Sequence, residues 1–305
     1  MTGIRSYSSG CISPQGFMKE AIGLYRSHAY GTTARARACV EDFLHVQSVL
    51  SERLHFSLQN LDILEIGPGQ FVSQMTCFSR CNRVVGIDLD VIVQGFAPRA
   101  YWQMLQVNGW RRTLKTIGRK VFGFDRAFAR ELRCQLGIMR LPRLQVLRMD
   151  VSEMDFPDQS FDFAYSRAVF HHLPDPHKAL CEIVRVLRPG GAVYIALHPY
   201  TSETGCLDPR VYTDRRKEVR GWPHLRKELQ NQVDQLNAYL NKLRISQWQE
   251  LFLSAMPEAE FIVTPGDPSC AVAAEALHSQ GELLDYSVEE LAAGEFVALW
   301  QKPRL

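Results

Sequence analysis

A short apolar run that breaks at two glycines constrains the fold of this chain more than any other stretch. Residues 61–70 read Leu-Asp-Ile-Leu-Glu-Ile-Gly-Pro-Gly-Gln. A buried parallel strand that turns sharply into a helix has this pattern. Glycine permits backbone angles that other residues avoid, and it lets a ligand lie against the main chain. We expect a strand over 61–66 and a helix over 70–80 whose N-terminal amides point at that ligand.

A second strand, over 83–88, ends in an acid that suits a ribose. Asp88 lies 23 residues after Glu65. A carboxylate in this place accepts hydrogen bonds from a ribose diol in nucleotide-binding folds. The dinucleotide fingerprint G-x-G-x-x-G would need a third glycine where Val72 stands, so a dinucleotide-dependent oxidoreductase is the weaker alternative.

Strands and helices alternate through the middle of the chain, which predicts a parallel sheet covered on both faces. The later strands are expected over 144–149, 161–166, 192–197, 260–264 and 295–301. Helices are expected over 16–25, 34–54, 99–107, 110–121, 126–137, 176–187, 227–243 and 247–255, and Ser287 opens a short one with a capping box.

Four motifs in order resemble those of class I S-adenosylmethionine (SAM)-dependent methyltransferases. Glu65-x-Gly67-x-Gly69 is similar to the family's E/D-x-G-x-G loop, although Phe71 stands where many members have a third glycine. The other motifs are Asp150 to Asp162, His171-His172-Leu173-Pro174-Asp175-Pro176, and Arg185 to Gly191. The resemblance runs from residue 61 to about 197. It implies an α/β fold with a Rossmann-like sheet of seven mostly parallel strands, closed by an antiparallel hairpin of the sixth and seventh.

Outside this core, the resemblance leaves a cap and several insertions. Residues 1–60 are expected to form an N-terminal helical cap packed on the sheet edge. The alternative is that this segment covers the cofactor, with Tyr25 or Tyr30 near its methionine end. The SAM-binding domain would span 61–305, with a basic helical insertion over 95–143 and substrate-side insertions over 201–258 and 266–292.

The resemblance also assigns the cofactor contacts. Asp88 would bind the ribose hydroxyls, Asp150 would bind the adenine amino group, and Glu65 would position the loop or the cofactor's amino group. The full predicted set is Glu65, Ile66, Gly67, Pro68, Gly69, Asp88, Leu89, Asp150, Val151, Ser166 and Arg167. Arg167 is expected to pair with Glu65 or with an anionic substrate. No metal site is expected.

Methyl transfer is an in-line displacement, so the enzyme must hold the acceptor atom about 3 Å from the methyl carbon. An alcohol or phenol must also lose a proton, and histidine suits this step near neutral pH. The candidates for the base are His171 and His172, after the fourth strand, and His198 at the end of the fifth. The pair resembles the His-His-Met-Pro-Asp segment of natural-product sugar O-methyltransferases, in which a histidine is the proposed base. A bracing role for both histidines stays open.

Positive charge is concentrated in one segment. Residues 95–145 contain eleven Lys or Arg and two acids, so they carry +9 and the rest of the chain, whose total is +2, carries −7. Leu114, Ile117 and Val121 share one helical face, and Arg112, Lys115, Arg119 and Lys120 take the other. We expect either a solvated basic face or a site for an anion, which would be an acidic substrate, a membrane surface or RNA.

The remaining composition predicts a globular, cytoplasmic protein. No apolar stretch approaches 18 residues, and the N-terminus lacks the apolar core of a secretory signal. Eight scattered cysteines predict reduced thiols rather than zinc ligands. The N/D-P-P-Y run of nucleic-acid amine methyltransferases is absent after Ser166, and no Pro-Cys dipeptide occurs, so nucleic-acid acceptors are disfavoured.

These features predict a SAM-dependent methyltransferase of natural-product biosynthesis. Its acceptor would be a small or glycan-like molecule, methylated at oxygen with a histidine base. Three alternatives remain: N- or C-methylation of a small metabolite, an RNA or lipid-linked acceptor held by the basic insertion, and a SAM-binding partner protein without catalysis. A homodimer is a further open alternative.

Overall fold

The computed structural model describes residues 31–208, 221–233 and 239–304. Its strands are β1 (Asp62–Ile66), β2 (Arg83–Asp88), β3 (Gln145–Arg148), β4 (Phe161–Arg167), β5 (Leu187–Leu197), β6 (Glu260–Pro265) and β7 (Ala293–Gln301). They form one sheet in the order β3-β2-β1-β4-β5-β7-β6. Only the pairings of β7 with β5 and β6 are antiparallel. The predicted seven-stranded, mostly parallel sheet is confirmed. The expected helix over 16–25, Tyr25 and Tyr30 lie outside the described residues.

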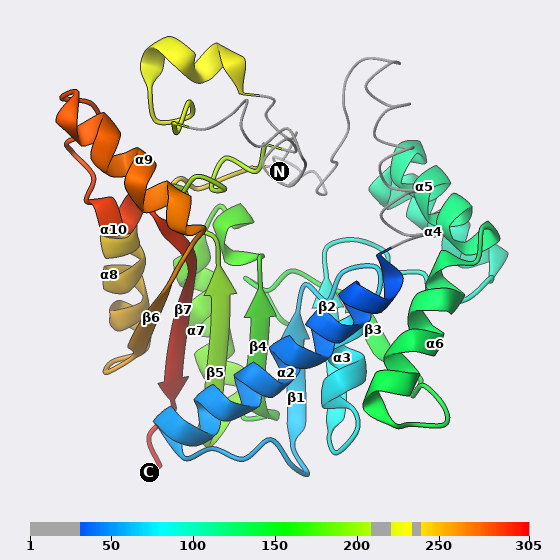
Figure 1. Ribbon diagram of the computed structural model, residues 1–305. Coiled ribbons are helices and arrows are strands. Elements are labelled where there is room, and N and C mark those ends of the chain that lie inside the picture. The colour runs from blue at the N-terminus through cyan, green and yellow to red at the C-terminus, as the bar shows by residue number, and fades with distance from the viewer. Residues whose placement is uncertain (1–30, 209–220, 234–238, 305) are drawn as a thin grey trace.

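Helices cover both faces of the sheet and bury an apolar core on each (Figure 1). One face carries α2 (Thr32–Leu54), α3 (Ser73–Phe78) and α6 (Phe124–Leu136), and the other carries α7 (Pro176–Val186) and α8 (Ile245–Ala255). A parallel sheet is buried on both sides because its crossover helices lie there. This three-layer arrangement leaves the ends of the strands as the place for a site.

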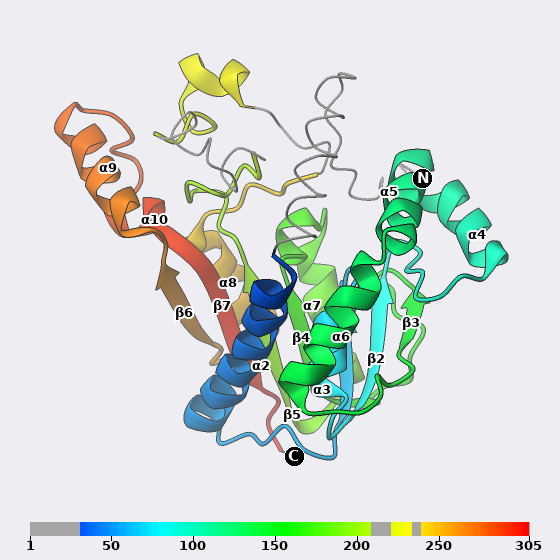
Figure 2. The ribbon, with the colours of Figure 1, turned by 45° about the vertical axis from the view of Figure 1, so that its right-hand side comes forward.

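The N-terminal helix α2 crosses the face of the sheet, whereas the sequence predicted a cap on the sheet edge (Figure 2). Its buried side chains are Ala36, Phe43, Val46, Val49 and Leu50. The ring of Phe43 meets that of Phe78 edge-on at 5.5 Å, and Phe78 in turn meets Tyr165 of β4 at 5.0 Å. The apolar side chains of α2 pack on this face because the central strands of a parallel sheet must be covered by apolar groups.

The turn after β1 is longer than predicted. Gly67 and Gly69 take φ values of +71° and +64°, and Val72 also lies in the left-handed region at +46°. Because these angles are incompatible with a right-handed helix, α3 begins at Ser73 and not near Gln70.

The basic insertion folds as three helices, close to the predicted ranges. They are α4 (Pro98–Asn108), α5 (Trp110–Val121) and α6. In both views α4 and α5 stand beyond the β2–β3 side of the sheet, toward the end where the parallel strands finish (Figures 1 and 2). Across the described ranges, no helix has both the length and the apolar content that crossing a bilayer requires.

The helix predicted over 227–243 is wrong. Lys227–Gln232 forms a 3-10 helix (η4), and residues 239–244 are not helical. Asn241 explains this difference, because its backbone amide donates to the carbonyl of His171 at 3.0 Å and its side-chain amide donates to that of Phe170 at 2.9 Å. These bonds hold residues 239–241 against a 3-10 turn, η1 (Phe170–His172).

The last predicted elements are confirmed. The strands of the β6–β7 hairpin are separated in the chain by α9 (Pro268–Ser279) and by the short helix α10 (Val288–Leu291). The Ser287 hydroxyl accepts from the Glu290 amide at 3.1 Å, which is the expected cap.

Gly67→Ala should destabilise the fold more than Gly69→Ala. Both positions have positive φ, so any side chain adds roughly 1–2 kcal/mol of strain. A Cβ on Gly67 would also lie 2.2 Å from Cγ2 of Val169, whereas a Cβ on Gly69 meets nothing within 4 Å. Overpacking adds about 1–3 kcal/mol for Gly67 alone. Urea unfolding of both variants tests this, and equal losses would contradict the contact with Val169.

Candidate active site

The glycine turn lies at the switch point of the sheet. β1 sits between β2 and β4, so the chain leaves β1 toward one side and later returns on the other. In open α/β sheets, ligands bind in the crevice that this reversal opens at the carboxyl ends of the strands. The Gly67 amide donates to the carbonyl of Ile87 at 2.8 Å, which ties the turn to β2. Pro68 lies against Gly86, where a Cβ would come within 3.1 Å of its ring.

Asp88 reaches back to the glycine turn. Its carboxylate accepts from the backbone amide of Asp90 at 2.8 Å and also from that of Gly69. Burial raises the pKa of Asp88 from 3.8 to about 6, against the opposing effect of these two amides. The turn and the acid therefore meet.

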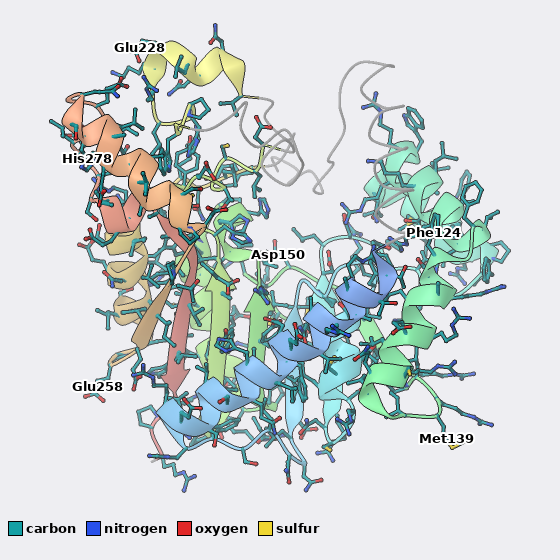
Figure 3. All side chains as sticks on the ribbon, in the orientation of Figure 1. Phe124, Met139, Asp150, Glu228, Glu258 and His278 are labelled. Atoms are coloured by element: carbon teal, nitrogen blue, oxygen red, sulfur yellow. The ribbon has the colours of Figure 1, made fainter. Side chains whose placement is uncertain are left out.

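Asp150 stands at the neighbouring strand end. Arg148 of β3 pairs in register with Asp88, and the Met149 amide donates to the Asp88 carbonyl at 3.0 Å. Asp150 follows at once, and its Oδ1 accepts from the Ser152 amide at 2.8 Å. Figure 3 shows Asp150 above the ends of the central strands. The two acids are thus at adjacent strand ends on the same edge of the sheet.

The apolar members of the predicted cofactor set differ in exposure. The side chains of Ile66 and Val151 are buried in the core, so only their backbone atoms are candidates for ligand contact. Leu89 is half-buried, and its carbonyl accepts from Nε of Arg148 at 3.2 Å.

Glu65 is a buried acid with an unsatisfied oxygen. Its side chain is 3% exposed, and among the described residues no donor reaches its Oε2. Burial, followed by the negative charges of Cys39 and Asp42, raises the pKa of Glu65 well above its usual value. Buried polar atoms in native proteins are nearly always paired, so an orphan beside a ligand turn marks a place for a polar ligand group. An ammonium group would satisfy it best.

Arg167 does not pair with Glu65, which corrects one prediction. Its guanidinium forms ion pairs with Asp42 of α2 and, at 2.9 Å, with Glu295 of β7. The neighbouring Ser166 is fully buried, and its hydroxyl donates to the carbonyl of Ile66 at 3.3 Å. These two residues therefore hold α2, β1 and β7 together at the site. Asp42 was missed because nothing in an amphipathic helix shows that one acid faces inward.

Three histidines gather at the ends of β4 and β5. The ring of His171 lies 4.2 Å from that of His172 and 5.9 Å from that of His198, measured between centroids. Nδ1 of His172 lies 2.8 Å from the carbonyl oxygen of Tyr239, and Nδ1 of His198 lies 3.3 Å from that of Gly294. Because a carbonyl only accepts, Nδ1 of His172 carries the proton and its Nε2 is left as an acceptor in the neutral ring.

Burial keeps the histidine pair uncharged. It lowers the pKa of His171 well below 6.5, and His172 and His198 lower it further. Burial also lowers the pKa of His172, against the opposing effect of its bond to Tyr239. Neutral imidazole is the form that accepts a proton. The pair belongs to the turn that Val169 begins, and Val169 is the residue that lies against Gly67.

A fourth histidine was missed by the sequence analysis. His224 is buried, its Nε2 lies 2.9 Å from the carbonyl oxygen of Tyr200, and burial lowers its pKa to about 4. It lies in the substrate-side insertion expected over 201–258, where no motif singled it out. Asn241, which holds the η1 turn, gave no signal either, since an isolated asparagine has no periodicity.

The thiols of Cys39 and Cys77 lie close to each other and near Glu65. Sγ of Cys39 lies 3.7 Å from Sγ of Cys77, and the described cysteines form no disulfide. Within the described ranges, no three His, Cys, Asp or Glu side chains are arranged to hold a metal ion.

Known proteins are similar to this chain over limited segments. Residues 108–195 match a family model described as a methyltransferase domain. That range includes Asp150 and the histidine pair, and it begins after the glycine turn and Asp88. The match and the sheet together support a class I SAM-dependent methyltransferase.

Two curated relatives carry more particular names. A phosphatidylethanolamine N-methyltransferase of Cereibacter sphaeroides is 36% identical over 72 residues, which are 24% of this chain and 34% of that protein. A phthiotriol/phenolphthiotriol dimycocerosates methyltransferase of Mycobacterium tuberculosis is 44% identical over 52 residues, 17% of this chain and 19% of that one. The match thus spans about a third of the first relative's length and about a fifth of the second's. A solved phosphoethanolamine N-methyltransferase 2 of Haemonchus contortus has a TM-score of 0.46 at 17% identity, covering 85% of this chain and 53% of that one.

Asp88→Asn should stabilise the protein without ligand at pH 8. A carboxyl whose pKa rises from 3.8 to about 6 on folding loses stability as pH rises between these values, because the folded state binds the proton more tightly. Removing the charge recovers up to about 3 kcal/mol above pH 6 and nothing near pH 4. Urea unfolding at both pH values measures the difference. A gain that does not change with pH would contradict the buried carboxylate.

Proposed function

We propose that this protein is a cytoplasmic SAM-dependent methyltransferase that methylates an oxygen of a small-molecule or glycan-like acceptor. The observation that carries the proposal is the contact between Gly67 and Val169. It brings the turn suited to the cofactor against the turn that bears His171 and His172. This closeness supports a donor site and a base that act on the same acceptor atom.

The chain's own groups fit SAM. Asp88 offers a carboxylate to the ribose hydroxyls, and Asp150 offers one to the adenine amino group. The unsatisfied Oε2 of Glu65 suits the ammonium of the methionine portion, and Gly69 leaves open space beside the turn. SAM, when bound, supplies a methyl group on a positively charged sulfur. The protein supplies the orientation of both reactants and the exclusion of water.

His172 is the better candidate for the base. Its bond to Tyr239 places the proton on Nδ1, so the proton-accepting lone pair of the neutral ring is on Nε2. His171 is 4% exposed and its carbonyl holds Asn241, which favours a positioning role. His198, directly after β5, places a third imidazole 5.9 Å from the His171 ring.

A lipid acceptor is the second candidate. Both named relatives are methyltransferases whose names include a lipid, phosphatidylethanolamine in one and a dimycocerosate in the other. A lipid amine would be methylated at nitrogen. It would need a group that accepts a proton from its ammonium form, and it would not need a base that activates an oxygen. Formation of S-adenosylhomocysteine with phenols and sugars, compared with phosphatidylethanolamine vesicles, distinguishes the two. If the protein binds SAM but forms no S-adenosylhomocysteine with either class of acceptor, a regulatory or partner protein is favoured.

Asp88→Asn should weaken SAM binding by at least about tenfold, since a neutral amide replaces the charged acceptor of two hydroxyl donors. Titration calorimetry with SAM at pH 8 measures the change. Affinity of the native protein should also fall below about pH 6, where Asp88 takes up a proton. Unchanged affinity in the variant would reject the ribose assignment.

His172→Ala should lower kcat by roughly 10²–10⁴ and leave SAM affinity unchanged, because a positioned base contributes about that much. His177→Ala, on the exposed side of α7, is the matched control and should retain activity. The acid limb of kcat/KM in the native enzyme should lie below pH 6.5, because the lowered pKa of His172 keeps the ring neutral to lower pH. Full activity of the His172 variant would transfer the role to another group.

A further inference from the structure

The helix α5 turns an apolar face outward. Trp110, Leu114, Ile117 and Val121 are spaced by one or two helical turns and are 59%, 51%, 39% and 71% exposed. We call these four residues the α5 apolar stripe. On the neighbouring α4, Trp102 is also exposed, at 61%. Ten of the sixteen large exposed apolar side chains in the described residues come from 95–143, so this surface is not a chance scatter.

The polar side of α5 is the side turned inward. Its buried residues are Thr113, Thr116 and Lys120. The Lys120 ammonium binds Asp125 at 3.0 Å and the carbonyl of Gln94 at 3.2 Å. Arg112 pairs with Asp90 at 2.7 Å. The sequence predicted a solvated basic face or an anion site formed by these residues, and the structure instead uses them in internal ion pairs.

An inverted helix of this kind needs an apolar cover. Amphipathic helices in a globular protein normally bury the apolar side, since exposing it forfeits the burial energy. Here the ion pairs with Asp90 and Asp125 fix the rotation of α5 that exposes the stripe. The stripe is therefore maintained by internal contacts.

Charge at the edge of this surface narrows the choice of cover. Arg111 lies beside the stripe with its guanidinium 5.4 Å from the Trp110 ring, and Arg99, Arg126 and Arg130 are exposed nearby in the sequence. The segment 95–145 carries +9 and the rest of the chain −7. An anionic surface would therefore attract this end of the molecule and repel the remainder.

We propose that the α5 apolar stripe, with its flanking arginines, docks the protein on an anionic lipid bilayer. Tryptophan at the interface, aliphatic residues in the acyl boundary and arginine at the head groups are the composition that such a surface takes. A second copy of the chain is disfavoured because two segments of +9 would face each other. RNA would bind the arginines and leave the stripe uncovered. The helix α5 stands toward the end of the sheet at which β2 finishes in Asp88 (Figures 1 and 2).

The test is binding of the full chain to vesicles of equimolar phosphatidylglycerol and phosphatidylcholine, measured by cosedimentation. The variant Leu114→Ser/Ile117→Ser should bind at least about tenfold more weakly, because two buried aliphatic groups are lost. The matched control Val272→Ser/Leu284→Ser removes two side chains that are 66% and 65% exposed elsewhere, and should bind as the native chain does. Pure phosphatidylcholine vesicles should bind more weakly, and added salt should reduce binding.

Four results would overturn the proposal: no binding to anionic vesicles, equal loss in the control variant, a dimer by sedimentation that the stripe variant abolishes, or RNA binding that it abolishes. Circular dichroism and SAM affinity verify that the stripe variant is folded. The readout does not involve methyl transfer. Failure of the enzymatic proposal would thus leave vesicle binding intact, and loss of vesicle binding would leave turnover of a soluble acceptor intact.

Discussion

The approach of Val169 to the backbone of Gly67 is the contact on which the arrangement of the site depends. A side chain at position 67 would separate the turn after β1 from the turn after β4. The first turn is the proposed cofactor turn, and the second carries the histidines. Glycine thus does more here than permit a positive φ, because the absence of a Cβ lets the two turns approach each other. The bond from Gly67 to β2 then fixes the turn to the strand that ends in Asp88.

Two acids of the candidate site, Glu65 and Asp88, are buried where their charged forms are disfavoured. Glu65 has a buried oxygen without a donor among the described residues, and Asp88 is sufficiently desolvated that its pKa rises to about 6. Each arrangement destabilises the empty protein, and each would be relieved by a cation or by hydroxyl donors. Stability and ligand binding are therefore opposed at these residues. The ion pairs of Arg167 with Asp42 and Glu295 connect β4 to α2 and β7 beside these acids.

The mostly parallel sheet and the position of Asp88 at the end of a strand were predictable, because period, turn residues and strand-end acids are local signals. The rotation of α5 was not predictable from its pattern. The sequence of a helix with one apolar and one basic side does not tell which side faces the protein. In α5 the ion pairs with Asp90 and Asp125 turn the basic side inward. The helix predicted over 227–243 failed for a similar reason. Asn241 exchanges helical hydrogen bonds for bonds to the η1 turn, and that partner is 70 residues away in the chain. Arg167 pairs with Asp42 of α2 and with Glu295 of β7, and no sequence spacing relates these three residues.

The placement of α4, α5 and α6 between two paired strands has an evolutionary consequence. β2 and β3 are adjacent in the sheet, so everything from residue 89 to 144 departs from one strand and returns to its neighbour. Within this segment α6 covers one face of the sheet, whereas α4 and α5 stand beyond its edge and can change in length without removing part of that core. Changes at the proposed docking surface can then accumulate separately from changes at the proposed active site, on different parts of one chain.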